Sequence, residues 1–138
     1  MTILVSRTDS IGDVVLTLPL VGAIKRYLPS SKVIFLGKSY TKAVIELCDD
    51  VDEFLNWDDL RKDLKKAHTV LQNKNINTAI LVFPDKQIAK VCKKAKIKHR
   101  IGTSHRVHNL LYCNRLINLS RRKSNEHEAI LNLKLLNK

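Results

Sequence analysis

Aromatic residues are scarce in this 138-residue chain, where Phe, Trp and Tyr together make up 5%. Proteins that bind single-stranded nucleic acid stack the bases on aromatic side chains, so this scarcity argues against that function. The three cysteines, Cys48, Cys92 and Cys113, are odd in number and form no C-x-x-C pair. They predict neither a disulfide framework nor a zinc site, and we expect reduced, buried thiols in a cytosolic protein.

Long apolar runs are absent as well. The longest nearly uncharged stretch, residues 14–24, is too short to cross a bilayer. The N-terminus reaches Arg7 and Asp9 too early for a signal peptide. The dinucleotide-binding pattern G-x-G-x-x-G and the P-loop are missing, and the histidines show no metal-ligand spacing. We therefore expect neither a bound cofactor nor a metal.

Acidic residues are few in the second part of the chain. Residues 1–60 hold 6 basic and 9 acidic side chains, whereas residues 61–138 hold 19 basic and 4 acidic ones, which together give the net charge of +12. Such an imbalance indicates a polyanionic partner: nucleic acid, an anionic membrane or a phosphorylated substrate. The hydrophobic fraction of 44% is that of a globular protein, so the charge belongs to a folded domain.

Short apolar runs alternate with helical patterns along the chain. The predicted strands span residues 3–5, 32–37, 51–55, 78–83 and 100–102. The predicted helices span residues 14–27, 40–48, 58–74, 86–96 and 126–136, and a basic loop with His105, Arg106 and His108 follows residue 102. This alternation predicts an α/β fold, a Rossmann-like three-layer parallel sheet. The loops at 7–13, 37–40, 84–86 and 102–106 should then share the edge where ligands bind.

The first strand–helix junction carries the most informative motif, Ser10-Ile11-Gly12-Asp13. Glycine lets a backbone approach a ligand closely, and the following helix offers free N–H groups. Spacing alone leaves two interpretations of Asp13 open. One is an N-terminal helix cap, which is the commoner role of such an aspartate; the other is a catalytic carboxylate. Pro19, inside the predicted helix, is expected to kink it.

Residues 3–19, ILVSRTDSIGDVVLTLP, resemble the opening of family 9 glycosyltransferases, the ADP-heptose–lipopolysaccharide heptosyltransferases. Their N-terminus has a strand, a basic residue, small residues, G-D-V and then T-x-P. Weaker matches follow in the family's order: Pro29, residues 51–53 (VDE), 100–102 (RIG), 111–112 (LY), 114–115 (NR), 127–128 (HE) and 132–133 (NL). The resemblance thus extends over nearly the whole chain.

The resemblance implies the N-terminal half of a GT-B glycosyltransferase, an architecture in which the N-terminal domain takes the acceptor and the C-terminal domain the nucleotide sugar. Residues 1–138 then form a single Rossmann-like acceptor-binding domain, and the C-terminal donor-binding domain is absent. The implied donor is ADP-heptose or another nucleotide sugar. We expect this chain alone to be inactive and to need the missing domain, in the same or a separate chain.

The resemblance also implies roles for five residues. Asp13 takes that of the general base, because an inverting sugar transfer needs a carboxylate to accept the proton of the attacking hydroxyl. Ser10 and Gly12 are expected to contact the acceptor sugar. Arg106 and His127 match basic residues that bind acidic groups of the acceptor, and a guanidinium suits phosphate well. The alternatives are a solvated loop arginine and a histidine that only begins a helix.

Lys86, Lys90, Lys93 and Lys94 share one predicted helix face, and residues 121–123 (RRK) form a second basic cluster. Such runs are usually solvated, but they also suit anionic lipid headgroups. Together with the resemblance they favour a phosphorylated glycolipid acceptor, such as lipopolysaccharide core, and a cytoplasmic enzyme peripheral at the inner face of the cytoplasmic membrane, with no nucleic-acid partner. The competing function is a non-catalytic basic binding module for nucleic acid or another anionic partner.

Overall fold

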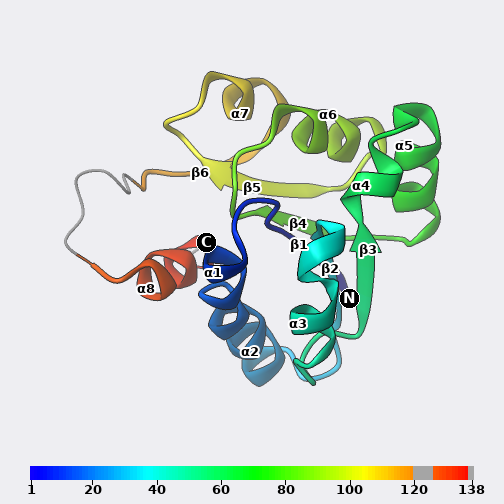
Figure 1. Cartoon of the computed structure of the whole chain (residues 1–138). Coiled ribbons are helices and arrows are strands. Elements are labelled where there is room, and N and C mark those ends of the chain that lie inside the picture. The colour runs from blue at the N-terminus through cyan, green and yellow to red at the C-terminus, as the bar shows by residue number, and fades with distance from the viewer. Residues whose placement is uncertain (120–125, 137–138) are drawn as a thin grey trace.

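The computed structural model describes residues 1–119 and 126–136, and these residues form one parallel sheet covered by helices (Figure 1). The six strands lie in the order β3-β2-β1-β4-β5-β6 and every pair is parallel. The strands are β1 (Thr2–Ser6), β2 (Lys32–Gly37), β3 (Glu53–Asn56), β4 (Thr78–Leu81), β5 (His99–Thr103) and β6 (Arg115–Ile117). The predicted Rossmann-like α/β fold is confirmed.

Helices cover both faces of the sheet, because the strands carry apolar side chains on both sides. The longer helices are α2 (Leu18–Tyr27), α5 (Leu64–Asn73) and α6 (Lys86–Lys94), and the shorter ones are α1 (Ile11–Val15), α3 (Lys42–Glu46), α4 (Trp57–Leu60), α7 (Val107–Tyr112) and α8 (Glu128–Leu133), with single turns η1 (Ser39–Thr41) and η2 (Lys134–Leu136). One core holds side chains of α4, α5 and α6, and the other holds side chains of α1, α2, α3 and α8. The sheet therefore has two separate hydrophobic cores.

Two predicted helices are each divided in the structure. The prediction over residues 14–27 becomes α1 and α2, with a break at Leu16 and Thr17. Pro19 lies in the first turn of α2, where its missing N–H removes no helical hydrogen bond. Instead of a kinked helix, the structure has a break between α1 and α2 just before this proline. The prediction over 58–74 becomes α4 and α5, because the Asp63 side chain accepts hydrogen bonds from the N–H groups of Lys65 and Lys66 and starts a new helix.

The region after β5 differs most from the prediction. It was expected to be a basic loop around Arg106, but it forms the helix α7 and the strand β6. Cys92 and Cys113 are buried free thiols, as expected, whereas Cys48 is half-buried. Burial raises the pKa of Cys92 to about 12 and that of Cys113 to about 11. No helix within the described ranges is long and apolar enough to span a membrane.

Candidate functional site

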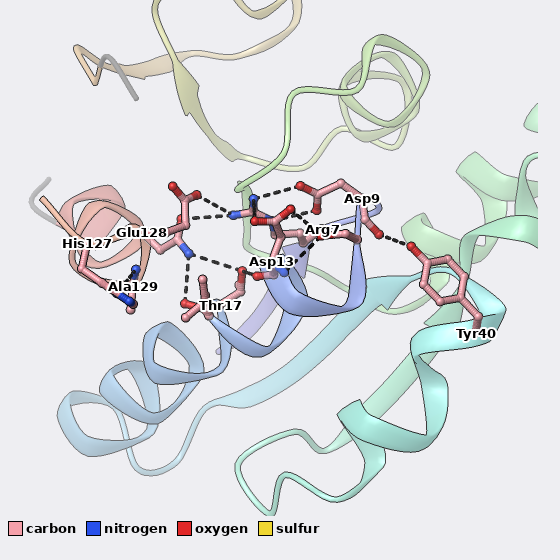
Figure 2. A network of polar contacts seen from close by, with 11 residues as sticks. Arg7, Asp9, Asp13, Thr17, Tyr40, His127, Glu128 and Ala129 are labelled. Atoms are coloured by element: carbon pink, nitrogen blue, oxygen red, sulfur yellow. Dashed lines mark hydrogen bonds and ion pairs between the residues drawn. The ribbon is translucent and has the colours of Figure 1, made fainter. Parts of the chain in front are cut away.

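The loops that follow the central strands meet at the carboxyl edge of the sheet. Ser6 at the end of β1 pairs with Leu36 of β2 on one side and with Leu81 of β4 on the other. The Tyr40 hydroxyl donates a short hydrogen bond to the carbonyl oxygen of Asp9, which joins the loop after β1 to the one after β2 (Figure 2). The expected common edge is therefore present, and residues 7–13 lie at its centre.

Ser10, rather than Asp13, caps the first helix. The Ser10 Oγ accepts a hydrogen bond from the backbone N–H of Asp13 at 3.3 Å and donates one to Asp13 Oδ2 at 2.6 Å. Asp13 is the third residue of α1, and its side chain is 38% exposed. The interpretation of Asp13 as the N-cap is thus wrong in detail, since the hydroxyl of Ser10 already fills that role.

Arg7 lies at the centre of a polar network that sequence reasoning did not single out (Figure 2). Its guanidinium donates to both carboxylate oxygens of Asp9, from Nε at 2.8 Å and from Nη2 at 2.9 Å. Nη1 donates to Glu128 Oε1 at 3.0 Å, and Nη2 lies 3.4 Å from Asp13 Oδ1. Three carboxylates therefore surround one cation, and Asp13 makes the longest of these ion pairs.

The Arg7 side chain is only 5% exposed, so its charge is largely removed from water. Burial by itself lowers the pKa of Arg7, but hydrogen bonds and opposite charge from Asp9 and Glu128 outweigh it, and the pKa is raised. The guanidinium is consequently a permanent cation. The bidentate bond to Asp9 fixes its plane and hence the direction of the edge that faces Asp13.

The C-terminal helix α8 completes the network from the far end of the chain. Asn132 accepts a hydrogen bond from Arg7 Nη1 at 3.3 Å, and its Nδ2 donates to the Leu16 carbonyl at 3.0 Å. This carbonyl lies at the break between α1 and α2, where the helical hydrogen bonding is interrupted. The side chains of α8 thus stabilise both the arginine and the end of the helix that carries Asp13.

The five predicted site residues are placed as follows. Ser10, Gly12 and Asp13 lie together at the start of α1, at the carboxyl edge of the sheet. His127 is the N-cap of α8, and its Nδ1 accepts a hydrogen bond from the Ala129 N–H at 3.2 Å. Arg106 is exposed at the start of α7, after β5, which is separated from β1 by β4.

Arg7, Glu128 and Asn132 are the residues that the sequence did not assign. Each stands in a segment that carries the family resemblance, so a signal was present, but nothing in the sequence shows that these segments meet. The assigned roles of Asp13, Ser10, Gly12, Arg106 and His127 stay predictions, because the structure places these residues without testing what they bind.

The surroundings of Asp13 suit proton transfer. Within residues 1–119 and 126–136, no group of three or more His, Cys, Asp and Glu side chains has a geometry that could hold a metal ion. Asp13 instead has one oxygen bound by the Ser10 hydroxyl and the other beside a buried guanidinium. A carboxylate that is held in place and still partly exposed can accept a proton from a bound hydroxyl group.

Comparisons with known proteins identify similar chains of greater length. No protein-family model matches this chain. A Haemophilus influenzae protein described as "Putative glycosyltransferase" is 27% identical over 136 residues, which are 97% of this chain and 39% of that protein. A solved family 9 glycosyl transferase from Veillonella parvula superposes with a TM-score of 0.83 at 19% identity, over 99% of this chain and 40% of that one.

The E. coli heptosyltransferase WaaC with ADP superposes with a TM-score of 0.77 at 19% identity, over 98% of this chain and 46% of that one. The predicted resemblance to family 9 glycosyltransferases is confirmed. The chain is similar to glycosyltransferases, and its α/β layer corresponds to one half of the GT-B fold. It spans about two fifths of the length of the curated relative.

Proposed function

We propose that this chain forms the acceptor side of a heptosyltransferase-like, inverting glycosyltransferase, with Asp13 as the general base. In this reaction the acceptor hydroxyl oxygen attacks the anomeric carbon while its proton passes to a carboxylate oxygen of Asp13. The bond from the anomeric carbon to the nucleoside diphosphate breaks on the opposite face. The observation that supports this role is the placement of Asp13, held by Ser10 and partly exposed at the carboxyl edge.

The donor is proposed to be ADP-heptose or another nucleotide sugar. The E. coli WaaC structures contain ADP or ADP-2-deoxy-2-fluoro heptose, and this chain matches 46% and 47% of them. We propose that the donor is held mainly by a second domain, so that this chain transfers no sugar by itself. The acceptor is proposed to be a phosphorylated glycolipid such as lipopolysaccharide core, for which Arg106 and His127 are the predicted contacts.

The deciding experiment measures sugar transfer from ADP-heptose by the chain combined with a donor-binding half, with Asp13→Asn as the variant. Loss of a general base costs on the order of a hundredfold or more in rate, so turnover should fall by that factor while acceptor affinity stays unchanged. Asp85→Asn is the matched control, because Asp85 is another aspartate at the start of a helix beside a central strand, where it only caps α6. Near-normal turnover of Asp13→Asn would exclude the assignment.

A further inference from the structure

The helix α7 has an inverted distribution of polar and apolar side chains. Asn109 is fully buried, and its Nδ2 donates a hydrogen bond to the Thr103 carbonyl at 2.9 Å. Val107, Leu110 and Leu111 are 77%, 56% and 61% exposed. Positions i, i+3 and i+4 lie on one side of a helix, so these three side chains form a single apolar stripe.

Such a stripe is unfavourable for a surface that only meets water. Leaving a Val or Leu side chain in water instead of burying it forgoes about 1.5–3 kcal/mol. Single exposed apolar side chains are ordinary, but grouped ones mark a surface that another body covers. We therefore expect the stripe on α7 to be covered by an apolar partner.

The helix beside this stripe is strongly basic. α6 packs against α7 (Figure 1), and the two are joined by a hydrogen bond from Lys93 Nζ to the Leu111 carbonyl at 3.1 Å. Lys86, Lys90 and Lys94 are exposed on α6. Over residues 64–119 the chain carries 12 Lys and Arg side chains and a single acidic one, Asp85, whose carboxylate caps α6. The helix packed against α7 thus exposes three lysines, and Asp85 is the one acidic residue in this part of the chain.

We propose that α6 and α7 form a docking surface for an anionic phospholipid membrane. The α6–α7 surface consists of Lys86, Lys90, Lys94, Val107, Leu110 and Leu111. Its lysines bind the headgroups, and its aliphatic side chains enter the boundary with the acyl chains, a combination that interfacial membrane proteins use. Nucleic acid could form ion pairs with the lysines, but it would not bury the apolar stripe, because bases stack on aromatic rings rather than on Val and Leu.

The position of the surface also suits a membrane-bound acceptor. α7 begins directly after β5, at the carboxyl edge of the sheet where Arg7 and Asp13 lie. A chain docked through α7 would hold this edge close to the lipid. Membrane docking is nevertheless a separate property from sugar transfer, and either one can fail without the other.

The test is flotation of the chain with vesicles of phosphatidylcholine alone or mixed with an equal amount of phosphatidylglycerol. We expect binding to the mixed vesicles only, and weaker binding as salt rises. Replacing Lys86, Lys90 and Lys94 with Gln should lower the affinity by about a hundredfold, since each basic residue contributes about 1 kcal/mol near such a surface. Lys93 is left unchanged in this variant, because its Nζ donates a hydrogen bond to the Leu111 carbonyl and so holds α7 against α6.

A second variant, Leu110→Gln/Leu111→Gln, keeps every charge and should lower the affinity about tenfold or more. The controls lie on elements that pack on the opposite face of the sheet: Leu28→Gln/Leu47→Gln for the apolar pair, and Arg26→Gln/Lys42→Gln for the lysines. Both controls should leave binding nearly unchanged, and thermal melts establish that all variants fold. Equal binding to both vesicle types, or no loss in the leucine variant, would overturn the proposal.

Discussion

Arg7 and Glu128 are 121 residues apart in the chain, and their side chains meet at 3.0 Å between Nη1 and Oε1. The contact attaches the last described helix to the loop that follows the first strand. Since Arg7 is also 3.4 Å from Asp13, the position of α8 influences the surroundings of the proposed base. Residues near the two ends of the chain thus build one site.

Glu128→Ala should destabilise the fold by about 1–3 kcal/mol, because it leaves a buried guanidinium with one hydrogen-bond acceptor fewer. Chemical denaturation measures the change in the free energy of unfolding. Glu126→Ala is the matched control: Glu126 pairs with Lys134 at 2.7 Å, but both side chains are more than 40% exposed. Exposed pairs contribute about 0–1 kcal/mol. Equal losses in the two variants would contradict the role given to Glu128.

Asp52 makes stability depend on pH in the acid range. Its carboxylate accepts hydrogen bonds from Lys25 Nζ and from the Val33 N–H, both at 2.6 Å. Burial tends to raise the pKa of Asp52, but the bonds to Lys25 and Val33 lower it below the ordinary value of 3.8. A lowered pKa means that the ionised group stabilises the fold at neutral pH, and that this contribution is lost as pH falls from about 3.8 through the folded-state pKa.

Asp52→Asn should therefore have a lower free energy of unfolding than the unmodified chain at neutral pH. This difference should disappear in strong acid, where Asp52 is protonated. Urea unfolding at a series of pH values measures this gap. Asp59→Asn is the control, because Asp59 is 69% exposed and only pairs with Lys62 at 3.6 Å. A gap that does not change with pH would show that the Asp52 charge is unimportant.

Residues that carry the family resemblance divide into two groups in the structure, which sequence alone does not reveal. Asp52 and Asn114 are structural: the Asn114 Oδ1 accepts a hydrogen bond from the Arg100 N–H at 2.8 Å, and its Nδ2 donates to the Lys98 carbonyl at 2.7 Å. Glu128 and Asn132 instead reach Arg7. The order of motifs is enough to predict the family, but only the fold shows which motifs meet.

The strand–helix alternation was readable because buried parallel strands are short and uniformly apolar. The helix α7 could not be predicted in the same way. A surface helix usually buries its apolar side chains and exposes its polar ones, whereas α7 buries Asn109 and exposes Leu110 and Leu111. The strand β6 has only three residues, none of them fully buried, and it leaves too weak a pattern to recognise. The largest differences in secondary structure between the prediction and the fold thus lie in the segment after β5, which contains α7 and β6.

Gly102, from the segment RIG, is required by packing. A Cβ at this position would lie 2.8 Å from Cys113 Sγ and 3.0 Å from Asn109 Nδ2, and all three residues are buried. Gly102→Ala should therefore destabilise the protein by about 1–3 kcal/mol through overpacking. Thermal and urea unfolding test this loss. The double variant Gly102→Ala/Cys113→Ala removes the closest atom and should recover part of the stability; no recovery would refute the steric explanation.

Gly12 presents the opposite case, and it links stability to function. A Cβ there would have no heavy atom within 4 Å, and no glycine among the described residues has a positive φ, so alanine fits the backbone. Glycine inside a helix costs roughly 0.5–1 kcal/mol relative to alanine, and Gly12→Ala should raise the free energy of unfolding by that amount. If an acceptor sugar approaches this backbone, the added methyl group should at the same time weaken binding of a phosphorylated core oligosaccharide, measured by calorimetry. A more stable variant with unchanged acceptor affinity would remove Gly12 from the site.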